Sequence, residues 1–282
     1  MKCCICSSNK IKILYKLKGY HVAKCKSCEL IFSWPPKKQD YEKNYFTEEH
    51  KKYFIGCGAG YDENDEKVTN FQNGLGLIEK YEKKTNKNIL DVGCATGVFL
   101  NIAKKRGWEV YGIDISKYAV DYAKKNFKIR ARAGELNKTS YKNEFFDVIT
   151  LWDSIEHINN PIKVIKVVKK ILKKQGILFI STINESSLMN KAADIIYKFS
   201  FGVIKKPIEL LHPRQHITHF SDRTLKNMLE KEGFEIIEIK KLEVPIKNLE
   251  GRWLKKQIIS FFYILQKISN KHYMIWVVAK KK

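Results

Sequence analysis

The chain has 282 residues, and its 53 lysines and arginines outnumber its 30 aspartates and glutamates, which gives a net charge of +23. With 44% hydrophobic and 12% aromatic residues it can bury an ordinary core, which excludes wholesale disorder. Seven cysteines are too few for a disulfide-stapled secreted scaffold. The sequence shows neither a signal-peptide core nor an apolar run long enough to span a membrane, so we expect a cytoplasmic protein with reduced thiols.

The positive charge comes almost entirely from lysine, with 47 lysines and only 6 arginines spread over nearly every segment. Arginine is the residue that recognises phosphates and base edges through two parallel hydrogen bonds, whereas lysine is a hydrated point charge. This composition favours a solvated lysine coat over a nucleic-acid surface. The charge would still draw an anionic acceptor, such as a nucleotide-sugar or a lipid-linked glycan, toward the protein.

Residues 1–36 contain two pairs of cysteines, namely Cys3 and Cys6, then Cys25 and Cys28, separated by eighteen residues. This is the spacing of a two-knuckle zinc ribbon, in which each pair supplies two corners of a tetrahedron. Four thiolates leave no open position for water, so the sequence predicts structural zinc. Cys4 could replace Cys3, although the two-residue gap favours Cys3, and four incidental free cysteines are the alternative.

The following segment, residues 37–87, is rich in Tyr, Lys and Glu, and we expect it to be a connector of loops and helices that caps the active site. From residue 88 onward, short apolar runs alternate with amphipathic segments of helical length. The expected strands are Ile89–Val92, Trp108–Ile113, Ile129–Ala133, Phe146–Leu151 and Ile177–Ser181, and the expected helices are Val98–Arg106, Lys117–Asn126 and Ile162–Lys173. This alternation predicts βαβ units and a mostly parallel sheet.

The last hundred residues are less regular. We expect a lid over residues 184–220, a helix over Asp222–Lys231, strands over Phe234–Leu242 and Tyr273–Ala279, and a cap helix over 250–268. Within that cap helix, residues 258–265 are apolar nearly all round and flanked by lysines. Burial against the sheet is one interpretation, and a peripheral contact with a membrane surface is the other.

A strand, a glycine-containing turn and a helix follow one another between Ile89 and Leu100, with Asp91, Gly93 and Gly97 in the turn region. Small residues let a ligand approach the backbone there, and the helix N-terminus favours a negative group. Asp114 ends the next strand, 23 residues after Asp91, close to the spacing of a ribose-binding acid in doubly wound folds. Ala95 and Val98 replace glycines that a dinucleotide loop needs, which disfavours NAD and FAD.

The Asp91-x-Gly93-x-x-x-Gly97 pattern followed by Asp114 resembles motif I and the acid after it in class I S-adenosylmethionine (SAM)-dependent methyltransferases. Further segments in the family's order resemble its later motifs, namely Ala133–Glu135, Phe145–His157, Lys174–Leu178 and Pro213–Ser221. The last is similar to the lid of a subgroup that carries an N-terminal zinc ribbon. The resemblance implies an α/β Rossmann-like sheet with helices on both faces, plus the small ribbon.

The same resemblance implies a role for each matching residue. The methionine part of SAM would lie beside Gly93, Cys94 and Gly97, with Trp152 and Asp153 lining that side and Asp91 holding the ammonium group. The ribose hydroxyls would bind Asp114. The adenine would contact Ile115, Gly134 and Glu135.

Methyl transfer from a sulfonium needs aligned reactants, and an alcohol acceptor must also lose a proton. The candidate bases are His157, His216 and His219, although each of these could simply hold the lid shut through hydrogen bonds. The Asp153-x-x-Glu156-His157 pattern also resembles ubiquinone-type O-methyltransferases, in which a divalent cation can sit beside the acceptor. Plain helix-start residues are the alternative for this pattern.

The acceptor is inferred from the subgroup alone. Ribbon-bearing members resemble enzymes that act on sugars, glycans and other small biosynthetic intermediates, so we expect a hydroxyl of such a molecule. An RNA methyltransferase is the leading alternative because of the ribbon and the charge, but arginine is scarce and no separate basic, aromatic module is evident. A non-catalytic SAM- or zinc-binding scaffold is the third hypothesis.

Overall fold

A seven-stranded sheet forms the centre of the molecule in the computed structural model, which describes residues 1–36, 66–82, 87–242 and 268–282. Its strand order is β10-β11-β8-β7-β4-β5-β6. The strands are β4 (Asn88–Val92), β5 (Glu109–Asp114), β6 (Arg130–Ala133), β7 (Phe146–Trp152), β8 (Leu172–Ile183), β10 (Phe234–Leu242) and β11 (Met274–Lys281). Strands β4 to β8 pair in parallel, whereas β11 is antiparallel to both β8 and β10.

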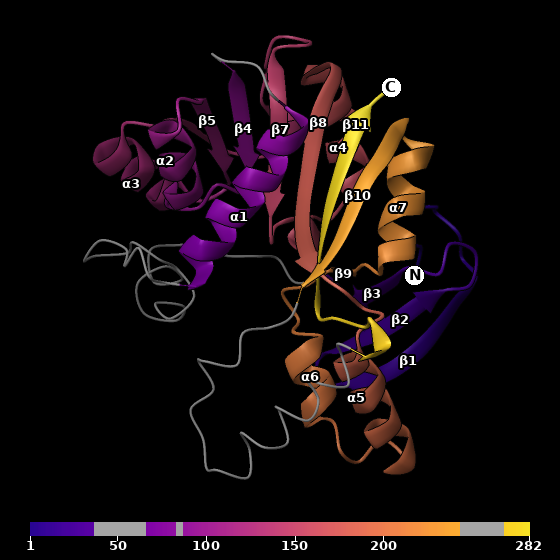
Figure 1. Ribbon diagram of the computed structural model, residues 1–282. Coiled ribbons are helices and arrows are strands. Elements are labelled where there is room, and N and C mark those ends of the chain that lie inside the picture. Colours follow the sequence, from indigo (N-terminus) through magenta and orange to yellow (C-terminus); the bar gives the residue numbers. More distant parts are fainter. Residues whose placement is uncertain (37–65, 83–86, 243–267) are drawn as a thin grey trace.

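Helices cover both faces of this sheet, because successive residues of each buried strand point to opposite sides. Ile89 packs with helices α1 (Glu66–Tyr81), α2 (Val98–Lys105) and α3 (Lys117–Phe127). Its neighbour Leu90 packs with α4 (Pro161–Ile171) and α7 (Asp222–Lys231) on the other face. Figure 1 shows α1 in front of the sheet and α4 behind it. The expected α/β Rossmann-like class is confirmed.

Most expected elements lie within a residue or two of their observed bounds. The largest difference is β8, which begins at Leu172, directly after α4 ends, instead of at Ile177. The backbone bends at Gln175, whose φ of 63° is left-handed, and the pairing of β7 with β8 shifts register at this point. The segment Lys174–Leu178, which resembles a family motif, therefore lies inside an irregular strand.

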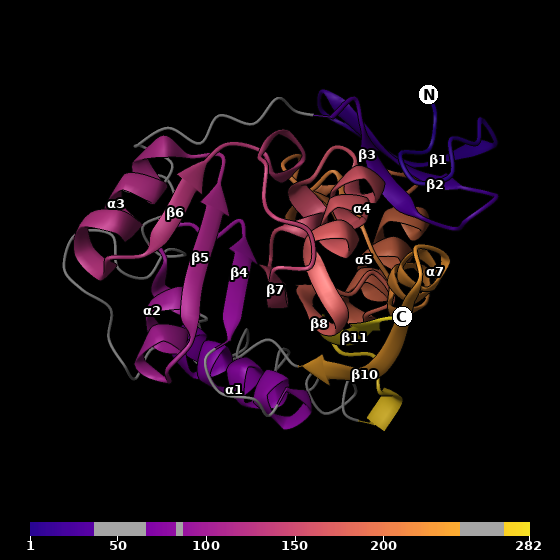
Figure 2. The ribbon, with the colours of Figure 1, turned by 90° about the horizontal axis from the view of Figure 1, so that it is seen from above.

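The cysteine-bearing N-terminus forms a second, four-stranded sheet with the order β1-β2-β3-β9. Residues 1–36 supply the antiparallel strands β1 (Ile11–Leu17), β2 (Tyr20–Cys25) and β3 (Ile31–Trp34). The fourth strand, β9 (Thr218–His219), comes from the segment expected to be the lid and pairs with β3. Figure 2 shows the ribbon strands beyond α4, on the side away from α1 and α2.

The ribbon is packed between the sheet and the lid. Leu30 and Phe32 belong to the same buried core as α4 and α7. On its other side, Tyr15 and Tyr20 pack against the lid helices α5 (Leu188–Phe199) and α6 (Lys206–Leu211). Figure 1 shows both lid helices beside the ribbon, beyond the end toward which β8 points.

Two expectations fall on residues outside the described ranges. The connector expected over 37–87 is described only for α1 and the few residues after it, and the cap helix expected over 250–268 is described only at its last residue. None of the helices in the described ranges is long and apolar enough to cross a membrane.

Candidate active site and cysteine cluster

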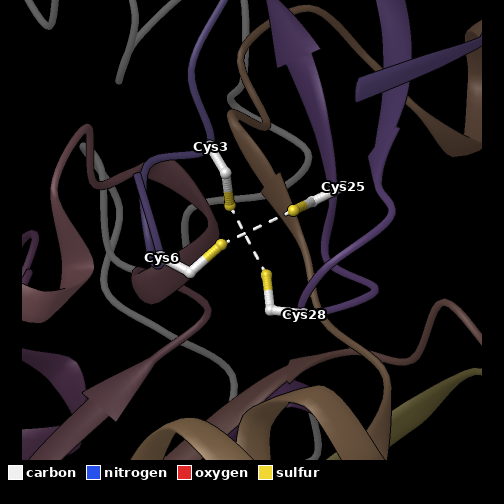
Figure 3. A group of neighbouring side chains, drawn as sticks. All are labelled: Cys3, Cys6, Cys25 and Cys28. Atoms are coloured by element: carbon white, nitrogen blue, oxygen red, sulfur yellow. Dashed lines mark hydrogen bonds between the residues drawn. The ribbon is translucent and has the colours of Figure 1, made fainter. Parts of the chain in front are cut away.

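The four predicted zinc ligands converge on one point (Figure 3). The sulfur atoms of Cys3 and Cys28 lie 3.5 Å apart, as do those of Cys6 and Cys25, and all four lie within 4.8 Å of one another. A tetrahedral zinc with bonds of about 2.3 Å would hold its sulfurs about 3.8 Å apart. Cys4 is outside this group, and burial raises the pKa of its thiol to about 12. The donor set therefore fits zinc through Cys3 and not Cys4.

A cavity of about 1350 Å³ opens where the parallel strands β4, β5 and β7 end. Open α/β sheets bind their ligands at this edge, because the loops that follow the strands leave a crevice there. The cavity exceeds the ~300–1000 Å³ typical of a pocket for a single small ligand. It therefore has room for a cofactor and a second molecule.

The turn after β4 brings backbone close to this cavity at two glycines with left-handed φ angles, 82° at Gly93 and 83° at Gly97. A Cβ atom on Gly93 would lie 2.7 Å from the Cβ of Ser154, and one on Gly97 would lie 2.6 Å from the Cδ1 of Ile129. Neither position accommodates a side chain. Ala95 also has a positive φ, 45°, so the loop carries some backbone strain between them.

Asp114 is held by the glycine loop itself. One of its carboxylate oxygens accepts a hydrogen bond from the Ala95 N–H at 2.9 Å, and the other accepts one from the Ser116 N–H at 2.8 Å. Desolvation raises its pKa, and the two N–H donors oppose that rise. A carboxylate has about four lone-pair sites, so Asp114 can still accept hydrogen bonds from a ligand in the cavity it lines.

Asp91 is almost fully buried at the base of the cavity and accepts a hydrogen bond from the Thr150 hydroxyl at 2.7 Å. Burial raises its pKa to about 7, which the hydrogen bond from Thr150 only partly offsets, and the nearby Asp114 and Asp153 carboxylates raise it further. A cationic ligand group would relieve this cost. Asp91 is therefore placed to pair with an ammonium group.

The other residues expected to hold the cofactor also border the cavity, namely Cys94, Ile115, Gly134, Glu135, Trp152 and Asp153. Ile115 is half exposed in the cavity, so it presents an apolar surface that a flat aromatic group could cover. Trp152 is packed by Phe71 of α1, with ring centroids 4.9 Å apart, and by Phe99 and Phe179. Ser181 donates a hydrogen bond to Asp153 at 2.6 Å.

Two of the three candidate histidine bases border the cavity. The rings of His157 and His216 meet edge to face, with centroids 4.7 Å apart. The Nδ1 of His157 lies 3.1 Å from the carbonyl oxygen of Gln215, which can only accept, so Nδ1 donates this hydrogen bond. Burial lowers the pKa of His216 to about 3, which keeps its ring neutral.

His219 lies behind these two rings and does not border the cavity. It is buried, and its Nε2 lies 3.1 Å from the hydroxyl of Ser33 in the ribbon. Burial lowers its pKa well below the usual value. The geometry places His219 between the ribbon and the lid, where it supports His216 from behind.

In the described part of the chain, two further groups of side chains could bind a metal. Within each group the ligand atoms lie within 4.8 Å of one another; one group is Glu156, His157 and His216, and the other is Glu185, His212 and His219. Glu156 is buried, accepts a hydrogen bond from Thr182 at 3.0 Å, and has a pKa raised to about 8, chiefly by desolvation. In the second group, His212 Nε2 lies 3.0 and 3.1 Å from the carboxylate oxygens of Glu185. The hydrogen-bond partner of His219, the third member of this group, is Ser33 outside it.

The sequence predicts that the segment 37–87, which contains α1, caps the active site, but it does not indicate which residues of α1 reach the cavity. Lys67 and Phe71, one helical turn apart, border the cavity, as do Leu210 and Gln215 of the lid segment. The i, i+4 spacing of Lys67 and Phe71 is a signal for a shared helix face, but nothing in the sequence indicates which cavity that face meets.

Comparison with known proteins decides the family. A family model described as a methyltransferase domain matches residues 68–239, which covers α1, the glycine loop, the histidine-bearing lid segment and most of the sheet. The chain belongs to this methyltransferase family. It is a SAM-dependent methyltransferase of class I. The ribbon lies outside the matched residues.

Among curated relatives, a ubiquinone biosynthesis O-methyltransferase of Actinobacillus pleuropneumoniae is 34% identical over 159 residues, spanning 48% of this chain and 68% of the relative. A protein of the same name from Coxiella burnetii is 32% identical over 180 residues, spanning 62% of this chain and 75% of the relative. The methyltransferase is thus similar in sequence to enzymes named for methyl transfer to oxygen.

Solved structures share the fold at lower identity. Geranyl diphosphate C-methyltransferase from Streptomyces coelicolor has a TM-score of 0.55 at 13% identity, covering 75% of this chain and 77% of that one. Phosphoethanolamine N-methyltransferase 2 from Haemonchus contortus has a TM-score of 0.54 at 18% identity, covering 74% of this chain and 52% of that one. Because these two enzymes methylate carbon and nitrogen by name, the fold does not specify the acceptor atom.

Proposed function

We propose that the methyltransferase transfers a methyl group to a hydroxyl oxygen of a small biosynthetic intermediate, with sugars and glycans as the first acceptors to test. The observation that carries this proposal is the placement of two imidazoles, His157 and His216, on the wall of the cavity in which Asp91 and Asp114 lie. The names of the curated relatives support oxygen as the acceptor atom. The size of the cavity supports a small molecule as the acceptor.

Bound SAM would supply an electrophilic methyl group. Asp91 would pair with its ammonium group, and Asp114 would accept hydrogen bonds from its ribose, while Trp152 and Phe71 exclude water from the same region. The hydroxyl of the acceptor must lose its proton as the new bond forms. His157 borders the cavity and is our first choice to take that proton, with His216 beside it.

We also propose that Cys3, Cys6, Cys25 and Cys28 bind one structural zinc, as their convergence supports. The three short strands of the ribbon enclose few apolar side chains of their own, so metal binding would supply much of their folding free energy. A divalent cation at Glu156, His157 and His216 is a second proposal, alternative to His157 as the base, because a ring nitrogen that binds a cation cannot also take the proton. It is favoured by the buried Glu156 carboxylate, whose raised pKa a cation would reverse.

The acceptor class can be tested with SAM labelled in its methyl group. We would incubate the full-length protein with a catechol, with nucleotide-sugars and, separately, with bulk RNA, and analyse the labelled product by mass spectrometry. The proposal predicts an O-methylated small molecule whose formation requires Asp114 and His157. Label in RNA, or on a nitrogen or carbon atom, would contradict it. Adding EDTA and then Mg²⁺ to the same assay tests the cation proposal.

A further inference from the structure

The tip of the lid exposes an unusual amount of apolar surface. Three side chains at the end of α5 and in the turn that follows it are almost fully solvent-exposed, namely Phe199 at 82%, Phe201 at 97% and Val203 at 80%. Four more large apolar residues of the same two helices and their turn are at least 41% exposed, namely Ile195, Ile196, Ile204 and Leu210. We call these seven residues the lid tip. Soluble proteins expose single apolar residues routinely, but seven within sixteen residues form an interaction surface.

The turn that carries these side chains is held in place. The Gly202 N–H donates to the Tyr197 carbonyl at 2.8 Å, and the Val203 N–H donates to the Ser200 carbonyl at 3.0 Å. The Ser200 hydroxyl accepts a further hydrogen bond from the Ile204 N–H at 3.0 Å. Phe201 has a φ of 52°, which is unfavourable for a bulky residue. The backbone therefore holds an aromatic side chain in solvent at some cost in strain.

Lysines outnumber carboxylates around the lid tip. Residues 195–210 contain Lys198, Lys205 and Lys206 against one carboxylate, Glu209, and Lys198 is paired with Asp194 at 2.6 Å. All three lysines are exposed. At the base of α5, Lys191 and Lys271 lie so close that each opposes protonation of the other, which lowers the pKa of Lys191. Aromatic and aliphatic side chains among lysines match the interface of an anionic bilayer, where acyl chains lie beneath negative headgroups.

The lid tip is also continuous with the cavity. Leu210 is 66% exposed on α6 and borders the cavity at the same time, next to Glu209 and Pro213. In Figure 1, α5 and α6 lie together beyond the sheet, beside the ribbon. A surface that rested against this tip would therefore lie at the entrance of the cavity.

We propose that the lid tip docks the methyltransferase onto an anionic lipid bilayer, with Phe199, Phe201 and Val203 entering the headgroup region and Lys205 and Lys206 contacting lipid phosphates. The consequence for the acceptor, that it is taken up at the bilayer surface, rests on the proposed function. The docking itself does not, because it requires neither cofactor nor turnover. A failure of the docking proposal can therefore be told apart from a failure of the proposed methyl transfer.

Sedimentation with lipid vesicles tests the docking on the full-length protein. We expect binding to vesicles of phosphatidylcholine mixed with phosphatidylglycerol, and much weaker binding to phosphatidylcholine alone. The double variant Phe199→Ser, Phe201→Ser should lower the affinity for the mixed vesicles about tenfold or more. The variant Lys205→Glu, Lys206→Glu should lower it similarly, and it places acids at the N-terminus of α6, where they do not destabilise the helix.

Matched controls carry the same changes elsewhere. Ile13→Ser on the ribbon strand β1 removes an exposed apolar side chain, and Lys124→Glu, Lys125→Glu on α3 reverses two exposed charges. Both should bind like the unaltered protein. Absence of binding to mixed vesicles at low salt, or equal losses in the controls and the lid-tip variants, would overturn the proposal. Light scattering that shows concentration-dependent dimerisation, without vesicle binding, would also overturn it if Phe199→Ser, Phe201→Ser abolishes the dimer. The tip would then bind a second copy of the chain.

Discussion

The hydroxyl of Ser33, in the last ribbon strand, lies 3.1 Å from Nε2 of His219, in the strand that the lid adds to the ribbon sheet. Three residues before His219, His216 borders the cavity, and the centroids of the two rings lie 6.3 Å apart. The hydroxyl of Tyr20 donates to the carbonyl of His212 at 2.8 Å, a second buried link between ribbon and lid. The ribbon therefore supports the wall of the cavity that carries the candidate bases.

This relationship predicts that metal loss impairs turnover more than cofactor binding. The Cys28→Ser variant removes one of the four zinc ligands, so the ribbon should lose its folded structure. Because β9 of the lid pairs with β3 of the ribbon, we expect the lid to loosen as well. The kcat should fall at least about tenfold while the Kd for SAM changes less than about threefold. Metal analysis and calorimetry on the same preparation measure both quantities.

Cys4→Ser is the matched control for this experiment, because Cys4 lies beside the cluster but outside the four converging sulfurs. It should retain about one zinc per chain and full activity. Loss of zinc from Cys4→Ser, or an equal loss of SAM affinity in Cys28→Ser, would contradict the assignment.

The raised pKa of Asp91 predicts a pH dependence of SAM binding. Pairing with an ammonium group needs the ionised carboxylate, and the pKa of Asp91 is raised to about 7 in the cavity without ligand. As pH falls below 7, the protein must lose a proton to bind, so the Kd should rise by up to about tenfold per pH unit. Calorimetry between about pH 5.5 and 7.5 measures this slope.

Asp91→Asn should weaken SAM binding near pH 7.5 and make the Kd for SAM depend less on pH. Asp121→Asn provides the control, because Asp121 is exposed on α3 and ion-paired with Lys117. An unchanged slope in Asp91→Asn would show that its carboxylate does not hold the ammonium group.

The effects of substitution should separate His219 from the other two candidate bases. Replacing His157 or His216 by Gln should lower kcat about 100-fold or more, because each borders the cavity, while leaving SAM affinity nearly unchanged. His219→Gln should chiefly lower the melting temperature, since His219 is buried and contacts Ser33 instead of the cavity. A 100-fold loss of kcat in His219→Gln at unchanged stability would instead assign the base to His219.

Comparison of sequence and structure shows where local pattern is sufficient. The helix over Asp222–Lys231 has the bounds expected from its sequence, because a capping box fixes its start. The Ser221 hydroxyl accepts a hydrogen bond from the Thr224 N–H, and the Thr224 hydroxyl accepts one from the Ser221 N–H. The choice of Cys3 over Cys4 followed from spacing alone, since two intervening residues place both sulfurs on one side of a tight turn.

Local sequence pattern does not predict contacts between segments that are far apart in the chain. Ser33 and His219 are 186 residues apart, and no periodicity indicates that β9 would join the ribbon sheet. The same limit applies to Phe71, whose packing against Trp152 depends on how α1 is laid over the sheet. The lid tip cannot be predicted from sequence for a different reason. Residues 195–204 have the composition of an ordinary buried helix, and only their solvent exposure in the structure distinguishes them.

The central claim is that the cavity beside the glycine loop binds SAM through Asp114. Calorimetric titration of the unaltered protein and of Asp114→Ala tests it most directly. We expect binding at one site per chain, weakened roughly 30-fold or more in the variant because two hydrogen bonds to a charged group are lost. Equal affinity of the two proteins for SAM, or no binding by the unaltered protein, would contradict the account.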